Sequence, residues 1–300
     1  MKPRIVLFSD DPGWHGARLR RAFARRGCVL RTASLRECRV DLHHAGGLRI
    51  PGFGDALPHG AFVRGIPAGG LEQVVLRLDV LHALQALGVP VYNRARCIEV
   101  SVDKAMTSLL LHAAGVPTPP TWAVESQAQA RRIVLEQTAR GHELVLKPMF
   151  GSQGVGLRRI AAGDALPQLD DGSVYYLQRY IGPRVGAGED YRVLVVGERA
   201  CAAMTRRSDG WVHNVAQGAR CLPAPADPQL AELALAASAA LDMDYAGVDL
   251  MRDRDGRLQV LEVNSIPAWK GLQGQTPFDI ADMLAQDFLD RCAPAWRRSA

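Results

Sequence analysis

The chain has 300 residues, of which 48% are apolar and 22% are charged, and its formal net charge is +5. These values indicate two globular domains, or one elaborated domain, with a large core, and they exclude a disordered chain. No apolar run approaches the roughly 20 residues that span a bilayer, and the N-terminus leads into a short strand instead of a signal sequence. We therefore expect a cytoplasmic protein without a membrane-spanning segment.

The distribution of basic and sulfur-containing residues narrows the function further. Basic residues are dispersed and aromatic residues are not interleaved with them, so we expect no nucleic-acid partner. The cysteines form no C-x-x-C pair, which favours reduced thiols over a zinc site or a disulfide framework. Lysine is rare and occurs only at Lys2, Lys104, Lys147 and Lys270. An internal lysine in an arginine-rich chain indicates a position where a compact ammonium group is needed.

The N-terminal third alternates short apolar strands with amphipathic helices. We expect strands over 4–8, 28–31, 61–64 and 89–93, helices over 15–26 and 71–87, and a Gly- and Pro-rich loop over 45–60. This alternation predicts a parallel sheet with crossover helices, that is, an α/β domain.

The pattern changes after Asn93. A helix is expected over 102–114, with Gly115 as its C-terminal stop and prolines beyond it. A second helix over 126–140 has Ser126 as a plausible N-cap. The expected strands over 144–147 and 155–160 follow, separated by a glycine-rich turn.

The glycine-rich turn runs from Lys147 to Gly156. It fits neither a Walker A loop nor a dinucleotide-binding fingerprint, because both of those lead into a helix. Exposed N–H groups at such a hairpin tip could fold over phosphates, with Lys147 as a point charge for them. A plain glycine hairpin is the alternative, and the loop alone does not decide between the two.

A second hairpin is expected near the C-terminus, between apolar strands over 247–251 and 261–264. Asp255-Gly256 between them is typical of a two-residue turn. If these two residues form the turn, Arg254 faces Arg257, and the register of the whole hairpin follows from that pair.

Counting outward from this turn places Asp249 directly opposite Glu262 on one face of the sheet. Because strand side chains alternate, Asn264 lies on the same face, opposite Gly247. Asp, Glu and Asn supply only oxygen ligands, which suits a hard cation such as Mg²⁺ and disfavours zinc or copper. An ordinary surface hairpin with polar residues on its solvated face is the alternative for these strands alone.

Several motifs occur in the order seen in ATP-grasp carboxylate–amine ligases, and within that superfamily the chain resembles the RimK-type α-L-glutamate ligases. The likeness runs from about Val91 to about Ala285. The motifs are Asp103-Lys104-x-x-Thr107, Gly115-Val116-Pro117, Lys147-Pro148 with Gly151-Ser152-Gln153-Gly154-Val155-Gly156, Asp190-Tyr191-Arg192, Asn214, Gly247-Val248-Asp249 and Glu262-Val263-Asn264-x-x-Pro267.

The resemblance implies an ATP-grasp fold in three parts. These are a pre-ATP-grasp parallel-sheet domain over 1–96, a central subdomain with the glycine-rich lid over 97–182, and a C-terminal subdomain with the metal ligands over 183–300. The last two parts would be α+β subdomains that clamp ATP.

The resemblance also implies roles for individual residues. The implied ATP contacts are Lys104, Lys147, Gly151, Ser152, Gln153, Gly154, the hinge residues Gln178, Arg179, Tyr180 and Ile181, and Asp190 on the ribose side. The implied ligands of two Mg²⁺ ions, for which Mn²⁺ could substitute, are Asp249, Glu262 and Asn264. The implied groups near the reacting carboxylate are Asn214 and either Arg206 or Arg207, and the sequence leaves the choice between the two arginines open.

The implied activity is ADP-forming ligation through an acyl phosphate. The leading hypothesis is addition of an amino acid, L-glutamate first, to a carboxylate of a small molecule or cofactor, and the alternative is modification of a protein or peptide tail. Close RimK relatives have Pro-Gly-x-Glu-Gly where this chain has Pro267-Ala268-Trp269-Lys270-Gly271, and glutamate at Arg179. Lys270 suits an anionic acceptor at the lip of the site. A non-catalytic nucleotide-binding module is disfavoured, and homo-oligomer formation is left open.

Overall fold

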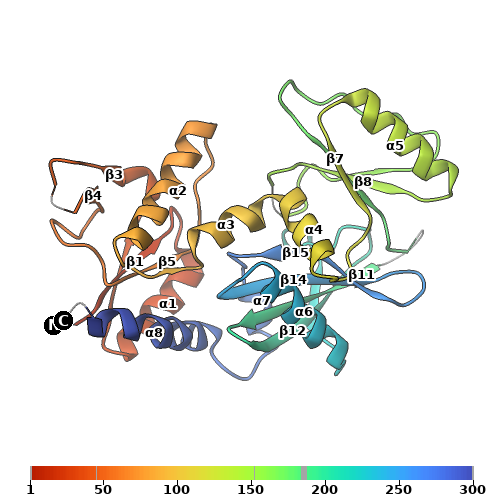
Figure 1. Ribbon diagram of the computed structural model, residues 1–300. Helices are drawn as coiled ribbons and strands as arrows, with labels where there is room; N and C mark the ends of the chain where they lie inside the picture. Colours follow the sequence, from red (N-terminus) through yellow and green to blue (C-terminus); the bar gives the residue numbers. More distant parts are fainter. Residues whose placement is uncertain (1, 45, 152, 184–187, 299–300) are drawn as a thin grey trace. The chain divides into compact units, whose positions relative to one another are not determined.

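The computed structural model describes residues 2–44, 46–151, 153–183 and 188–298 of the chain, which divides into two compact units (Figure 1). Unit 1 comprises Met1–Glu99, Met243–Ala246 and Ser265–Ala300, and unit 2 comprises Val100–Asp242 and Gly247–Asn264. The C-terminal segment therefore belongs with the N-terminal residues. The division into three parts with boundaries after residues 96 and 182 stays a prediction.

A parallel four-stranded sheet with the order β2-β1-β5-β6 forms the centre of unit 1. Its strands are β1 (Arg4–Phe8), β2 (Val29–Ala33), β5 (Gly60–Val63) and β6 (Val91–Tyr92). The predicted parallel sheet is thus confirmed. Because β2 lies on one side of β1 and β5 on the other, the strand order reverses between β1 and β5.

Helices cover both faces of this sheet. Val6 and Phe8 of β1 belong to the same hydrophobic core cluster as Leu84 of α2 (Leu71–Ala86). Phe62 of β5 faces the other way and lies 6.1 Å from Phe23 of α1, measured between ring centroids. Figure 1 accordingly shows α2 on one side of the sheet, with α1 and α8 on the other. The helices that begin or lie in unit 1 are α1 (Gly13–Arg25), the short η1 (Leu35–Glu37), α2 (Leu71–Ala86), α3 (Ala95–Val102), α7 (Lys270–Gln273) and α8 (Ile280–Arg298).

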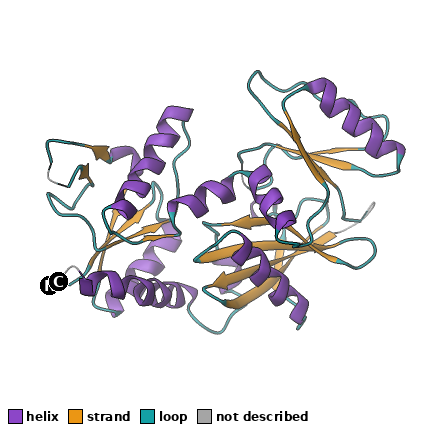
Figure 2. Ribbon diagram, in the orientation of Figure 1, coloured by secondary structure: helices purple, strands orange, loops and turns teal. Residues whose placement is uncertain are grey.

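Unit 2 contains two further sheets, and Figure 2 shows the helices beside them. The first has the order β7-β10-β8-β9 and is antiparallel, and α5 packs on it through Ala130 and Val134. The second has the order β13-β12-β11-β14-β15, and α6 contacts it. Their elements are α4 (Lys104–Ala113), β7 (Thr121–Val124), α5 (Gln127–Ala139), β8 (Leu144–Lys147), β9 (Arg158–Ile160), β10 (Tyr175–Arg179), β11 (Gly188–Val196), β12 (Arg199–Ser208), η2 (Val215–Gln217), β13 (Arg220–Pro223), α6 (Pro228–Ala240), β14 (Tyr245–Arg252) and β15 (Leu258–Asn264).

Several expected boundaries differ from the structure, and three differences are instructive. The helix expected over 102–114 begins only after Asp103, whose carboxylate caps α4 by accepting from the N–H groups of Ala105 and Met106 at 2.9 and 3.0 Å. The strand expected over 155–160 begins at β9, because Gly154 and Gly156 have φ angles of 73° and 76°, which a strand does not accommodate. The loop expected over 45–60 contains the short strand β4 (Leu48–Arg49), which pairs with β3 (Arg39–Val40).

The turn of the C-terminal hairpin was predicted wrongly. Strand β14 ends at Arg252 and β15 resumes at Leu258, so the connection is longer than Asp255-Gly256. The carboxylate of Asp253 organises it by accepting from the N–H groups of Asp255 and Arg257 at 3.0 and 2.9 Å. Arg257 therefore belongs to the loop and does not pair with Arg254.

The pairing of the two acidic residues was nevertheless predicted correctly. Asp249 lies opposite Glu262, and Gly247 lies opposite Asn264. The register shifts between Leu250 and Asp249, which leaves Leu261 as an additional residue in β15. Such a β-bulge places two residues opposite one, and here it offsets the error made at the turn.

None of the helices in the described residues is long and apolar enough to cross a membrane.

Candidate active site

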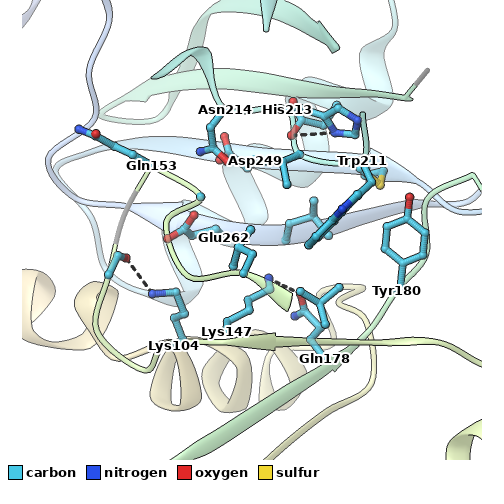
Figure 3. A pocket seen from close by; sticks show the side chains of 18 of the residues that line it. Lys104, Lys147, Gln153, Gln178, Tyr180, Trp211, His213, Asn214, Asp249 and Glu262 are labelled. Carbon is cyan, nitrogen blue, oxygen red and sulfur yellow. Dashed lines mark hydrogen bonds and ion pairs between the residues drawn. The ribbon is translucent and has the colours of Figure 1, made fainter. Parts of the chain in front are cut away.

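A pocket in unit 2 collects most of the predicted site residues (Figure 3). Its empty space, including space open to solvent, is about 860 Å³. Arg207 and Asn264 are not among the lining residues, and Ser152 lies outside the described residues. The predicted residues that line it are Lys104, Lys147, Gly151, Gln153, Gly154, Gln178, Arg179, Tyr180, Ile181, Asp190, Arg206, Asn214, Asp249 and Glu262.

Lys147 projects into the pocket from the end of β8. Its Nζ donates to Oε1 of Gln178 at 2.6 Å, and Nε2 of Gln178 in turn donates to Oγ1 of Thr121 at 3.2 Å. Burial lowers the pKa of Lys147 to about 8, although the negative charges of Glu262 and Asp249 act in the opposite direction. The ammonium group is thus held in place by a neutral amide, and its charge is destabilised until an anion approaches.

Lys104, the first residue of α4, points into the same pocket. Its Nζ donates to the carbonyl groups of Met149 and Gly151 at 3.2 and 2.9 Å, so it ties the glycine-rich loop to α4. Burial lowers the pKa of Lys104, and the charge of Glu262 partly offsets this effect. In Figure 3 both lysines and Gln178 approach from one side of the pocket, while Asn214 and Asp249 lie on the other.

Two arginines and two aspartates form what we call the arginine–aspartate network: Arg192, Arg206, Asp190 and Asp249. Arg206 donates through Nε and Nη2 to both oxygens of Asp190, at 2.6 and 2.7 Å. Its Nη2 also lies 3.0 Å from Oδ2 of Asp249. Arg192 donates to both oxygens of Asp249, through Nη2 at 2.7 Å and through Nε. All four side chains are buried.

The network sets the protonation of its members. Burial raises the pKa of Asp249, but the guanidinium groups of Arg192 and Arg206 more than offset this and bring the pKa below its ordinary value. Burial likewise opposes the charge of Arg206, and its two acidic partners raise its pKa. Asp249 and Arg206 are therefore stabilised in their charged forms by their partners, which is the condition under which buried charges are tolerated.

The structure distinguishes the two candidate arginines. Arg206 lies opposite Asp190 in the antiparallel pair of β11 and β12 and faces the pocket. Arg207 lies opposite Glu189 on the other face, where its Nη2 and the Glu189 carboxylate are 2.5 Å apart and both side chains are exposed. Only Arg206 is therefore positioned to contact a molecule in the pocket.

Glu262 is the carboxylate best suited to hold a cation. Among the described residues its carboxylate accepts no hydrogen bond, although it lies close enough to Lys104 and Lys147 to influence the pKa of both. Asp249 faces it across the hairpin but is engaged by two arginines. Asn264 donates through Nδ2 to the carbonyl of Gly247 at 3.3 Å. These oxygen-only donors fit Mg²⁺ in chemistry, with Glu262 the most available ligand.

The glycine-rich loop contacts the segment that follows β12. A Cβ atom added to Gly154 would lie 2.6 Å from Oδ1 of Asn214, so only glycine allows this approach. Nε2 of Gln217 donates to the carbonyl of Gln153 at 3.3 Å. The loop therefore lies over the pocket, as a phosphate-covering lid would.

Apolar side chains form another part of the lining. Tyr180 and Trp211 meet edge to face with ring centroids 6.1 Å apart, and Ile181, Met251 and Leu261 line the pocket with them. A flat aromatic base fits such an environment, with hydrogen bonds supplied by the neighbouring backbone.

Three residues of this site received no role from the sequence. Arg192 belongs to the motif Asp190-Tyr191-Arg192, but no role was predicted for it; it shares a strand face with Asp190 and contacts Asp249. Trp211 lies in a loop without a recognisable motif. His213 is buried in the lining with Nδ1 3.7 Å from Oδ2 of Asp190.

Comparisons with known proteins agree with this architecture. A RimK-like ATP-grasp domain matches residues 101–288. Over 237 residues the chain is 33% identical to the tetrahydromethanopterin:alpha-L-glutamate ligase of Methanococcus maripaludis, covering 77% of this chain and 78% of that protein. Over 286 residues it is 30% identical to the ribosomal protein bS6–L-glutamate ligase of Escherichia coli O139:H28, covering 93% of each.

A solved structure shows the same fold. The ATP-grasp ligase PsnB, complexed with a minimal precursor, Mg and ADP, matches with a TM-score of 0.70 and 20% identity, over 97% of this chain and 98% of that one. The predicted ATP-grasp fold is thereby confirmed. Together with the domain match and the curated relatives, this places the chain in the RimK-like ATP-grasp family of ligases.

Proposed function

We propose that this chain joins L-glutamate to a carboxylate of a small molecule or cofactor, in a reaction driven by ATP. The observation that carries the proposal is the meeting of Lys104, Lys147 and Glu262 in one pocket beside the glycine-rich loop. Two partly buried ammonium groups whose pKa burial lowers lie here with a carboxylate that accepts no hydrogen bond from the described residues. ATP together with a divalent cation has the complementary charges.

In this proposal the residues of the pocket divide the binding of ATP among them. Lys104, Lys147 and the N–H groups of the glycine-rich loop bind the phosphates, while Tyr180 and Ile181 flank the base. Glu262, with Asp249 and Asn264, would hold Mg²⁺, which supplies positive charge at the phosphates when bound. Two ions are implied by the resemblance, and their number is part of the proposal.

The chemistry follows from the weakness of a carboxylate as an electrophile. The acceptor carboxylate attacks the γ-phosphorus of ATP, which forms an acyl phosphate and releases ADP. The amine of glutamate then adds to the acyl carbon, loses a proton and expels inorganic phosphate, leaving an amide. Arg206, which lines the pocket, is suited to bind the negatively charged oxygen of the tetrahedral intermediate, with Asn214 beside it.

The lid has a defined task in this scheme. An acyl phosphate reacts with water, so the pocket must exclude water between the two steps. The contacts of the glycine-rich loop with Asn214 and Gln217 would keep the lid closed during that interval. Opening would then release the products.

A protein tail is the second candidate acceptor. The relative from Methanococcus maripaludis is named for a small-molecule acceptor and the relative from Escherichia coli for a ribosomal protein. We favour the small molecule because the chain is more similar in sequence to the first relative, at 33% identity against 30% for the second. The match to the first relative covers less of the chain.

Mass spectrometry tests both candidates together. The enzyme is incubated with ATP, glutamate and either the small-molecule fraction or the protein fraction of a cell extract. We expect a small molecule to gain the mass of glutamate units, and we expect no gain with Glu262→Ala. A gain confined to the protein fraction would favour the second candidate, and no gain in either fraction with active enzyme would contradict the proposal.

A further inference from the structure

A group of cationic and aromatic residues lies beside the carboxyl ends of strands β1 and β5 in unit 1. Its members are His15, Arg64, Trp269 and Lys270. Arg64 directly follows β5, and its N–H donates to the carbonyl of Phe8, the last residue of β1, at 2.8 Å. His15 lies on α1, the helix that follows β1. Because the strand order reverses between β1 and β5, both residues flank the switch point of a parallel sheet. Ligands of open α/β sheets bind there, outside the carboxyl ends of the strands.

Trp269 connects these two residues. The guanidinium carbon of Arg64 lies 4.5 Å from the centroid of the Trp269 ring, and its Nη1 donates to the carbonyl of Pro267 at 2.7 Å. The rings of His15 and Trp269 lie 4.5 Å apart, and Nε2 of His15 accepts from the backbone N–H of Trp269 at 3.2 Å. Since Nε2 accepts, the neutral imidazole carries its proton on Nδ1, where it can donate.

Trp269 also has an unused donor. Its side chain is fully buried, and its indole N–H has no acceptor among the described residues. A buried donor without an acceptor is costly, so such groups are uncommon unless a ligand or water meets them.

The positive charge of this group is not balanced by an acid. Lys270 is exposed, and within the described part of the chain neither Lys270 nor Arg64 forms an ion pair with a carboxylate. Burial, together with the charges of Arg64 and Lys270, lowers the pKa of His15 to about 4. Like charges held together in this way are stabilised by an anion among them.

The segment that follows Arg64 is held in place without any ligand. The buried side chain of Arg77 donates to the carbonyl groups of Pro67 and Ala68 at 2.8 and 3.1 Å. A Cβ atom on Gly69 would lie 2.4 Å from Oε1 of Gln73, so this loop packs tightly on α2. Because the loop is ordered beforehand, little entropy is lost when a ligand binds beside it.

We propose that His15, Arg64 and Lys270 form a binding site for an oxyanion of the acceptor, separate from the carboxylate that is activated. This inference rests on the proposed function, because it assumes an acceptor molecule. The planar guanidinium of Arg64 can pair with two oxygens at once, and Lys270 adds a mobile ammonium group. A second carboxylate and a phosphate share this chemistry, and binding probes distinguish them.

Calorimetric titration of the full chain without ATP tests the site, with glutarate and inorganic phosphate as the probes. We expect at least one of them to bind, and more weakly at high ionic strength. Lys270→Ala should weaken binding about fivefold, the upper range for an exposed ion pair, and Lys270→Glu should weaken it more. Arg64→Ala is a second test, with thermal unfolding as the check of its fold. Arg21→Ala, exposed on the same helix as His15, is the matched control and should bind as the wild type does.

The two probes also identify the oxyanion. For the binding component that weakens in Lys270→Glu, tighter binding of glutarate assigns a carboxylate, and tighter binding of phosphate assigns a phosphate. Binding that is unchanged in both Lys270 variants, or no binding of either probe to the wild type, would overturn the site. The titration involves no turnover, so a chain that binds a probe but never ligates glutamate would contradict the proposed function and leave this site standing.

Discussion

The pocket of unit 2 contains two sets of charged residues that differ in how their charges are balanced. In the arginine–aspartate network, Arg206 bridges Asp190 and Asp249 and all members are buried. Lys104 and Lys147 form no ion pair within the described residues, and burial lowers the pKa of both. The first set can hold its geometry in the absence of a ligand, whereas the second gains stability when an anion binds. We therefore expect mutations in the first set to affect folding strongly, and mutations in the second set to affect ligand binding and activity with little effect on folding.

The largest effect is expected for Glu262→Ala, which removes the carboxylate that accepts no hydrogen bond from the described residues. Loss of one group that stabilises charge in a transition state lowers the rate about 10²–10³-fold. Because Glu262 is the proposed metal ligand, we expect the rate of glutamate-dependent ADP release to fall by at least this factor. The free energy of unfolding should change by less than about 0.5 kcal/mol, as for a surface substitution. A coupled ADP assay and denaturant unfolding measure the two quantities. Unchanged turnover would refute the metal assignment, and Glu189→Ala, on the exposed face of β11, is the control.

Arg206→Ala should act on folding as well as on activity. Removing one partner of a buried ion pair costs about 3–5 kcal/mol, because the carboxylates of Asp190 and Asp249 lose a counter-charge. Arg207→Ala on the same strand is the matched control and should cost at most about 1 kcal/mol, since its pair with Glu189 is exposed. Denaturant unfolding of both variants checks the comparison, and equal losses would show that the network has no special role.

A smaller effect is expected for Gly154→Ala, which should impair closure of the lid. The added methyl group would meet Asn214, and the left-handed backbone, with φ at 73°, costs about 1–2 kcal/mol for a residue other than glycine. We expect turnover to fall roughly 5- to 30-fold, with more ADP released per amide formed. Gly163→Ala, also at positive φ but with nothing near its added Cβ, separates backbone strain from the contact. Identical kinetics of the two variants would exclude a role for the contact.

The smallest effect concerns pH. Because the pKa of Lys147 in the ligand-free chain is about 8, its ammonium group is charged at pH 7 and mostly neutral at pH 9. ATP affinity should therefore fall about tenfold over this interval if the charged form binds. Lys147→Arg, which keeps its charge, should lose most of this dependence, with a remainder from Lys104. Titrations of ATP binding at several pH values would contradict the assignment if both proteins showed the same slope.

Much of the fold could be predicted because its signals are local. Alternating strands and helices predict the parallel sheet of unit 1, and Ser126 predicts the start of α5, where its hydroxyl accepts from the N–H of Gln129 at 3.4 Å. The boundary at Asp103 was missed because two helices with similar composition follow each other directly, and only the cap separates them.

The site could be predicted only in part because its remaining features depend on register and long-range contacts. The pairing of Asp249 with Glu262 was obtained from a turn that is longer than expected, and the bulge at Leu261 restored it. No local pattern indicates such a bulge. The choice of Arg206 over Arg207 requires the register of β11 and β12, and the contact of Arg192 with Asp249 joins residues that are distant in sequence.

The central claim is that an acceptor carboxylate is activated by phosphorylation. The most direct measurement follows isotopically heavy oxygen from a labelled acceptor carboxylate during one turnover with ATP and glutamate. Our account predicts that the released phosphate contains one heavy oxygen atom, because the carboxylate oxygen that attacks phosphorus leaves with it. Phosphate without the label, with amide formed, would contradict the account.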